Sequence, residues 1–314
     1  MSGLWNCRQK RRHHGAGARS GRAFGPTWAR RAVASAVDSP FTIQIVPYGG
    51  CTLSSMSAGS HGRTLRLRVG TYNIHRCRGM DGRTDPARTA AMIADLRVDL
   101  IALQEVIGTG LTSTGHAERI ADIVGLHWAM APTRRFRGHL FGNVVLSRFP
   151  IAVHTQYNLI SSRREPRCCQ RTDLLVDGHI LHVYNVHLGT GLIERRRQAV
   201  QLATILDDPD VGLPKVVLGD FNEWVRGPAT SVLTERLESV DLVAHLKRRV
   251  TYPGFLPLLH LDHIYYKGRL RVCGLELRRT RRALVTSDHL PLVAELEVTF
   301  DAAGRHASGP PRHV

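Results

Sequence analysis

Apolar and polar residues alternate in several short stretches of this chain, and the alternation predicts β-strands. In the stretch from Leu65 to His75, Leu65, Leu67 and Val69 fall on one face, and Arg66 and Arg68 fall on the other. Successive side chains of a strand point to opposite faces, so this stretch predicts a half-buried strand. Residues 99–105 are almost continuously apolar before Gln104 and Glu105, which predicts a strand buried on both faces.

The rest of the chain alternates between strand and helix signals. Further strands are predicted at 126–130, 141–147, 151–160, 172–176, 180–187, 216–220, 261–266, 270–277 and 290–298. Helices are predicted at 85–97, 117–124, 192–206 and 229–237, the first with Asp85 as its N-cap and Pro86 as its first residue. Gly178 indicates a hairpin turn. Because hairpins occur beside strand–helix alternation, we expect an α/β protein with mixed sheets covered by helices.

Both ends of the chain differ in composition from the middle. Residues 1–37 carry basic but no acidic side chains, and residues 1–60 lack sustained periodicity. We expect residues 1–60 to be a basic disordered tail or a misassigned start, with Met56 as a candidate start and a targeting peptide as the weaker alternative. Residues 301–314 predict a second disordered tail. The folded domain is expected at 64–300.

The net charge of +17 over 314 residues predicts an anionic partner. Nucleic acid, an anionic phospholipid surface and a phosphorylated small molecule all fit. No basic segment interleaved with aromatic residues is recognised as a stacking platform for bases. No apolar run approaches a membrane span. The six cysteines lack paired spacing, which favours reduced thiols and a cytoplasmic location, while the basic N-terminal segment leaves an organellar or exported form open.

Polar residues with catalytic potential follow the apolar runs of most predicted strands. They are Asn73, Glu105, His187, Asp220 with Asn222, Asp262 with His263, and Asp288 with His289. Each alone is typical of a solvated loop. Strand ends of a layered α/β protein meet at a common rim where ligands bind, so the six together predict one site. If the strand before Asp220 persisted to Asn222, both side chains would face one pocket; the alternative is a turn.

The chain resembles the endonuclease/exonuclease/phosphatase superfamily, in its DNase I-like and sphingomyelinase-like branches, from about Leu65 to Phe300. The resemblance is carried by Thr71-Tyr72-Asn73, Leu103-Gln104-Glu105, Asn185-Val186-His187-Leu188, Gly219-Asp220-Phe221-Asn222, Leu261-Asp262-His263-Ile264 and Ser287-Asp288-His289-Leu290-Pro291. It implies a four-layer α/β/β/α sandwich of two packed, mostly antiparallel sheets.

The resemblance also implies roles for individual residues. Glu105 would hold Mg²⁺ (or Mn²⁺) with Asn73 and Asp288 near it, since hard oxygen ligands suit these ions. Asp220 would orient or deprotonate the attacking water, and Asn222 would position that water or a phosphate oxygen. His187 and His289 would contact the phosphate, with Asp262 orienting His289. Arg164, in a tripeptide similar to one of DNase I, would bind phosphate.

Three functions follow from this interpretation. The leading hypothesis is a monomeric, metal-dependent phosphodiester hydrolase acting on nucleic acid, as an endonuclease or exonuclease. The alternative is a phosphodiesterase or phosphatase for phospholipids or inositol phosphates. The apolar segment Tyr252–Leu259 is a candidate membrane contact for it, although a buried connecting loop is the favoured interpretation of this segment. A non-catalytic scaffold is the third, disfavoured because clustered acids are costly without a cation. Substrate identity, endo or exo action and diester or monoester preference stay open.

Overall fold

The computed structural model describes residues 41–45, 63–111, 113–159, 165–223, 227–240, 251–253 and 260–301, all within the compact unit Pro40–Val314. In chain order the elements are β1 (Phe41–Ile45), β2 (Arg63–Asn73), η2 (His75–Cys77), α1 (Pro86–Leu96), β3 (Leu100–Gly110), α2 (His116–Val124), β4 (His127–Phe136), β5 (His139–Ser147), β6 (Ile151–Leu159), β7 (Arg167–Val176), β8 (His179–His187), α3 (Leu192–Leu206), β9 (Lys215–Asp220), α4 (Pro228–Thr234), β10 (Glu238–Ser239), β11 (Asp262–Lys267), β12 (Leu270–Leu277), α6 (Arg281–Thr286) and β13 (Leu292–Phe300).

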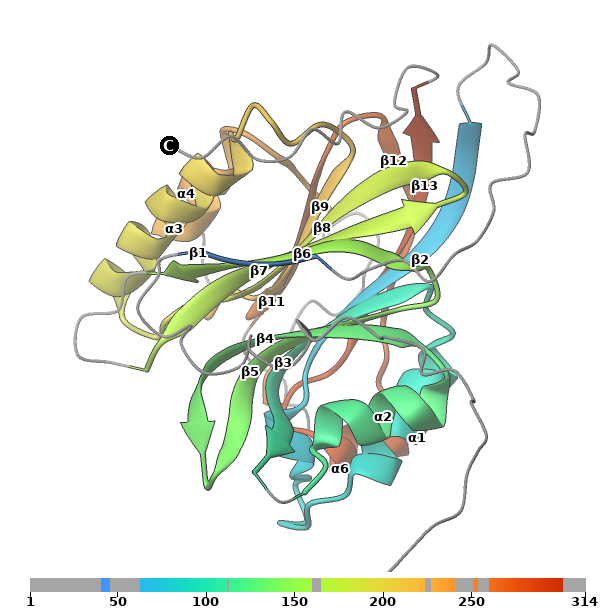
Figure 1. Ribbon diagram of the computed structural model, residues 1–314, viewed down its shortest axis with the longest axis vertical. Coiled ribbons are helices and arrows are strands. Elements are labelled where there is room, and N and C mark those ends of the chain that lie inside the picture. Colours follow the sequence, from blue (N-terminus) through green and yellow to red (C-terminus); the bar gives the residue numbers. More distant parts are fainter. Residues whose placement is uncertain are drawn as a thin grey trace, which may run out of the picture. The chain divides into compact units, whose positions relative to one another are not determined.

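The strands form two sheets that pack face to face (Figure 1). One has the order β1-β6-β7-β8-β9-β11-β10, and the other has the order β12-β13-β2-β3-β5-β4. Within the described strands, only the pairs β2–β3 and β8–β9 are parallel. Helices α3 and α4 cover the outside of the first sheet, whereas α1, α2 and α6 cover the second. The expected four-layer sandwich of mostly antiparallel sheets is therefore confirmed.

Strand alternation divides the apolar residues into three layers. On β2, Leu67 and Val69 point into the core between the sheets, whereas Tyr72 points out toward the helices. On β8, Val183 faces the inter-sheet core and Tyr184 faces α3 and α4. Every strand near the centre is covered on both faces, which explains the nearly continuous apolar runs in the sequence.

Some predicted elements match the structure, whereas the short elements η2 and β10, helix α6 and strand β1 were not predicted. Helix α3 matches its predicted range, and Asp85 caps α1 by accepting a hydrogen bond from the Arg88 amide at 3.0 Å. Helix α6 was not predicted, because six residues show too little periodicity. Strand β1 lies within the segment 1–60, where a tail was expected, and pairs antiparallel with β6. The other residues of that segment, and 302–314, lie outside the described residues.

Neither a membrane-spanning helix nor a disulfide occurs in the described part of the chain. None of its helices is both long and apolar enough to cross a bilayer. Its four cysteines, at positions 77, 168, 169 and 273, are free, whereas Cys7 and Cys51 lie outside the described residues. Burial raises the pKa of the Cys168 thiol to about 12, so this thiol stays protonated and unreactive at neutral pH.

Candidate active site

The layer between the two sheets changes from apolar to polar toward one end of the sandwich. Along β2, the inward positions after Val69 are Thr71 and Asn73; along β8, the positions after Val183 are Asn185 and His187. On β9, Asp220 follows Leu218 on the inward face. The same alternation that builds the core therefore aims these polar side chains into the space between the sheets.

A buried amide network forms the boundary between the apolar core and the site. The Gln104 side chain donates to Asn185 Oδ1 at 2.8 Å, and Asn185 Nδ2 donates to Gln170 Oε1 at 3.2 Å. All three residues are fully buried. Buried amides are costly unless hydrogen-bonded, so this network fixes how the two sheets are positioned against each other beneath the site. The sequence analysis did not recognise these residues as part of the site.

Three catalytic candidates lie side by side on adjacent strands. His187 of β8 and Asp262 of β11 are both direct cross-strand partners of Asp220 on β9. The Asp220 carboxylate accepts a hydrogen bond from Asn73 Nδ2 at 3.0 Å and lies 3.5 Å from His187 Nε2. Burial raises the pKa of the Asp220 carboxyl to about 6, against the charge of His289, which lowers it. Asp220 is thus a carboxylate at neutral pH with the basicity of a general base.

Asn222 follows β9 in a turn, so of the two alternatives that the sequence left open the turn is correct. Strand β9 ends at Asp220, and Asn222 has a left-handed φ of 52°. Its backbone N–H donates to Asp220 Oδ1 at 2.9 Å, and its side-chain Nδ2 donates to the Leu188 carbonyl at 2.8 Å. Asparagine tolerates this conformation better than most residues. Asn222 therefore holds the second oxygen of Asp220 and closes the loop after β8.

His289 forms a buried ion pair with Asp262. Its Nδ1 lies 3.0 Å from Asp262 Oδ2, and its Nε2 lies 3.8 Å from Asp220 Oδ2. Burial lowers the pKa of His289, but the charges of Asp262 and Asp220 outweigh it and raise the pKa to about 10. His289 is therefore an imidazolium at neutral pH, oriented by Asp262 as expected and facing Asp220.

His187 has the opposite surroundings. Its Nδ1 lies 3.0 Å from Nη1 of Arg167, and it is 4% exposed. Burial, together with the charges of Arg167 and His289, holds the pKa of His187 well below 6.5. The two histidines thus flank Asp220 in different states, one neutral and one charged.

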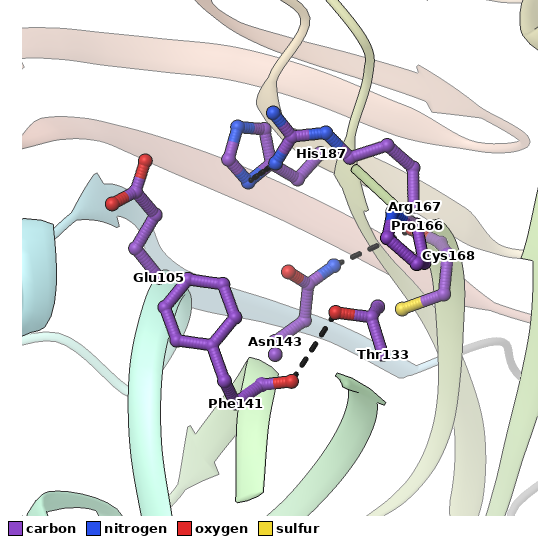
Figure 2. A pocket seen from close by; sticks show the side chains of 9 residues that line it. Glu105, Thr133, Phe141, Asn143, Pro166, Arg167, Cys168 and His187 are labelled. Atoms are coloured by element: carbon purple, nitrogen blue, oxygen red, sulfur yellow. Dashed lines mark hydrogen bonds between the residues drawn. The ribbon is translucent and has the colours of Figure 1, made fainter. Parts of the chain in front are cut away.

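Glu105 is aimed into the site by a β-bulge. In a regular strand, Glu105 would share the face of Leu103, which packs against the helices. The register of β3 with β5 instead shifts between Leu103 and Val106, and Glu105 has a φ of 57°. Its side chain then lines a narrow pocket with His187 and Asn143 (Figure 2). The accessible volume of this pocket is about 10 Å³, which is room for about one water molecule.

The remaining predicted metal ligands lie at the same end of the sandwich. His75 connects them: its amide donates to Asn73 Oδ1 at 3.0 Å, and its ring lies 3.5 Å from Asp288. Partial burial raises the pKa of Tyr252, and the negative charges of Asp288, Asp220 and Glu105 raise it further. The charges of all three carboxylates therefore act on the same phenol.

These residues fit a hard divalent cation that keeps water or substrate ligands. Within the described ranges, no three Asp, Glu, His or Cys side chains form a complete metal cluster. The predicted set offers two carboxylates and one amide, and Mg²⁺ typically takes few protein ligands and retains several waters. The Glu105 side chain makes no hydrogen bond or ion pair with the described residues. A half-buried carboxylate that faces a polar pocket and has no partner among the described residues is stabilised by a cation.

Two expectations fall on residues outside the described ranges. They concern Arg164, the predicted phosphate contact, and residues 254–259 of the predicted membrane segment. His263 received no role from the sequence. Its Nε2 lies 3.0 Å from the Glu223 carbonyl and its ring packs edge-on against Phe221, so it braces the strand that carries Asp262.

Comparison with known proteins assigns the family. The profile of the endonuclease/exonuclease/phosphatase family matches residues 70–289, which include every site residue described above. The chain belongs to this family. Its members generally hydrolyse phosphoester bonds and typically use divalent metal ions.

Both curated proteins and solved structures are similar to this chain. The uncharacterized protein YbhP of Escherichia coli K12 is 30% identical over 247 residues, covering 74% of this chain and 96% of YbhP. A family structure from Beutenbergia cavernae has 22% identity and a TM-score of 0.58, covering 74% of this chain and 72% of that one. A mannosyl-6-phosphatase from Bacteroides thetaiotaomicron has 18% identity and a TM-score of 0.60, covering 73% and 99%. The structural likenesses establish a shared fold.

The His289–Asp262 pair is expected to make the stability of this family member pH-dependent. A folded pKa of about 10 lies above the ordinary value of 6.5, so the contribution is fully present below pH 6.5 and is lost as pH rises through about 10. Urea unfolding at pH 7 to 10 should show this decline. The Asp262→Asn variant should show a flatter decline over the same range, and an equal decline in both proteins would contradict the assignment.

Proposed function

We propose that this protein hydrolyses phosphodiester bonds of nucleic acid with the help of Mg²⁺ or Mn²⁺. The observation that carries the proposal is the buried Asp220 carboxylate, held by Asn73 and flanked by a neutral and a charged histidine. A base, a cation and a hydrogen-bond donor around one small pocket are what attack of water on a phosphodiester requires.

Each side chain has a distinct task in this reaction. Asp220 accepts the proton of the attacking water, and Asn73 and Asn222 keep its two oxygens oriented. The imidazolium of His289 donates to a phosphoryl oxygen and balances the negative charge that develops there. His187 is a second, neutral donor. Glu105, Asn73 and Asp288 would hold the divalent ion, which would neutralise charge on the phosphoryl and leaving oxygens.

A cluster of arginines around Phe136 favours nucleic acid as the substrate. The guanidinium carbons of Arg76, Arg134 and Arg137 lie 5.5, 5.4 and 5.4 Å from the centre of the Phe136 ring. This arginine cluster occupies the β4–β5 hairpin and η2, and η2 follows Asn73 directly. Arg134 also stacks over Phe141, which lines the catalytic pocket. The cluster is therefore continuous with the site.

The arginine cluster corrects the sequence interpretation, which recognised no basic segment interleaved with aromatic residues. Arg134-Arg135-Phe136-Arg137 is such a segment, and Arg76 joins it only in the fold. Arg134 pairs with Glu165, but no described carboxylate pairs with Arg76, Arg135 or Arg137. The guanidinium groups of Arg76 and Arg137 lie beside the Phe136 ring without a described carboxylate partner, an arrangement that suits a strand of phosphates and bases.

An anionic lipid surface is the second candidate partner, favoured by the start of α3. Leu192 and Ile193 are 61% and 71% exposed, and the exposed Arg196 and Arg197 follow them one turn later. Apolar and basic side chains on one helix suit a bilayer of anionic lipid. The Leu188 carbonyl, just before this helix, contacts the site residue Asn222.

The function is tested by incubating the full chain with single-stranded DNA, supercoiled plasmid, anionic phospholipid vesicles and a phosphomonoester, each with Mg²⁺ and with EDTA. The expected result is that DNA is cleaved with Mg²⁺ and is not cleaved with EDTA. If the DNA stays intact and phosphate or a headgroup is released from another substrate, the proposed substrate would be a lipid or a small phosphoester instead of nucleic acid. Inertness toward every substrate would overturn the proposal.

The arginine cluster should make DNA binding dependent on salt. An Arg76→Gln/Arg137→Gln double variant is expected to weaken binding and to reduce the slope of log K against log salt by about two, roughly one per lost phosphate contact. Fluorescence anisotropy with labelled DNA between low and moderate salt measures this slope. The matched control is Arg196→Gln/Arg197→Gln on α3, which removes the same charge. An equal loss in both variants would show a diffuse charge effect and contradict a local binding surface.

A further inference from the structure

A guanidinium group stands behind one of the two site histidines where a carboxylate stands behind the other. The Nδ1 atom of His289 faces Asp262, whereas the Nδ1 atom of His187 faces Arg167 at 3.0 Å (Figure 2). Arg167 is 9% exposed, so water does not substitute for it. Nδ1 of His289 therefore faces a hydrogen-bond acceptor, whereas Nδ1 of His187 faces a hydrogen-bond donor.

The chemistry of arginine fixes the proton on His187. A guanidinium has only N–H donors and keeps its charge at all physiological pH values, so His187 Nδ1 must supply a lone pair to Arg167. A neutral imidazole with a bare Nδ1 carries its single proton on Nε2. That nitrogen lies 3.5 Å from Asp220 Oδ2, inside the site. Protonation of Nδ1 would place two donors and two positive charges face to face.

Arg167 is itself held in place from both sheets. Its Nη2 pairs with Glu165 Oε2 at 3.1 Å, and Glu165 Oε1 accepts hydrogen bonds from Arg134 Nη2 and Nε at 2.6 and 2.9 Å. Arg134 belongs to β4 of the six-stranded sheet, whereas Arg167 begins β7 of the seven-stranded sheet. The Glu165 carboxylate thus joins the sheets and prevents the Arg167 fork from turning away from His187.

We propose that Arg167 is a positioning residue that holds His187 as the neutral Nε2–H tautomer, so that His187 donates a hydrogen bond into the site and only His289 carries charge. The groups that face His187 agree with this role: Arg167 behind the ring, and Asp220 and His289 in front of it. A second imidazolium beside Asp220 would compete with His289 for the same carboxylate. By keeping His187 neutral, Arg167 leaves the Asp220 carboxylate free to accept a proton from water.

The tautomer is measured directly by ¹⁵N-edited NMR of the histidine side chains in the full chain. The chain has 17 histidines, so the His187 signals are assigned from their loss in His187→Gln. We expect a bare Nδ1 and a protonated Nε2 across neutral pH. A protonated Nδ1 in the native protein would overturn the proposal.

Three substitutions separate positioning from packing. Arg167→Met removes the group that donates to His187 Nδ1. Arg167→Lys keeps a charged donor there. Arg167→Glu places a hydrogen-bond acceptor beside Nδ1, which would then have to carry a proton. Arg167→Met is expected to lower kcat roughly 10–100-fold with little change in KM, as for other residues that orient an active-site histidine. Arg167→Lys should recover most of the loss, and Arg167→Glu should move the proton to Nδ1. Unchanged tautomers in Met and Glu variants that fold would overturn the proposal.

The kinetic part of this inference rests on the proposed phosphodiesterase activity, whereas the tautomer does not. Absence of activity on every substrate, together with the Nε2–H form in the native protein, would remove the function and leave the role of Arg167 intact. Full activity of Arg167→Met, with His187 still in the native tautomer, would remove the role of Arg167 and leave the proposed function intact. If Arg167→Met fails to fold, the native spectrum and Arg167→Lys still decide the question.

Discussion

An Asp220→Asn variant is expected to lose about 10³-fold or more in kcat on whichever phosphoester the native protein hydrolyses. Asparagine keeps the size of the side chain, but it has one acceptor oxygen instead of two and cannot accept a proton from water. General bases typically contribute 10²–10⁴-fold, and Asp220 is the only described carboxylate that lies between both site histidines. Steady-state kinetics with excess Mg²⁺ measure the loss.

The control for this variant is Asp173→Asn. Asp173 is also a buried acid of the seven-stranded sheet, but it pairs with Arg171 and His182 and lies away from the site. Its loss should affect urea stability and leave kcat within a few-fold of the native value. If Asp220→Asn retained more than a tenth of the native kcat, Asp220 would not be the base.

A Glu105→Gln variant is expected to lose most of its response to Mg²⁺. The substitution keeps the shape of the side chain and removes the unpaired charge that the β3 bulge aims into the pocket. A bound divalent ion contributes several kcal/mol to phosphoryl transfer, which corresponds to about 10²–10³-fold in rate. Titration of activity with Mg²⁺ should show a weaker apparent affinity and a lower plateau.

Metal binding by Glu105 can be measured without activity. Mg²⁺ binds only the folded state, so it should raise the melting temperature of the native protein and have little effect on Glu105→Gln. Glu297→Gln is the matched control, because Glu297 pairs with Arg66 and Arg271 on the surface of β13. An equal Mg²⁺ response in native protein and Glu105→Gln would place the ion elsewhere.

The arginine cluster and Arg167 show why part of the site escaped the sequence analysis. Arg76 and Phe136 are 60 positions apart, and only the packing of η2 against the β4–β5 hairpin brings them together. Arg167 precedes His187 by twenty positions and contacts it across the β7–β8 pair. A sequence pattern identifies apolar periodicity and strand ends, whereas contacts between distant side chains depend on sheet register.

The sequence by itself determined the layered α/β class, the bounds of helix α3, the cap of α1 at Asp85 and the residues Asn73, His187 and Asp220 at the ends of strands. Asp262 and His289 were expected to follow strands, but Asp262 begins β11 and His289 precedes β13. These features follow from local periodicity, and inward alternation then converges them in one place.

Only the tertiary structure decided how Glu105 and Asn222 face the site, and which charge each histidine carries. Plain alternation would have placed Glu105 under the helices, and the bulge in β3 reverses it. Asn222 arrives through a left-handed turn after the strand has ended. Burial and the charges of Arg167 and His289 keep His187 neutral, whereas the charges of Asp262 and Asp220 outweigh burial and keep His289 protonated.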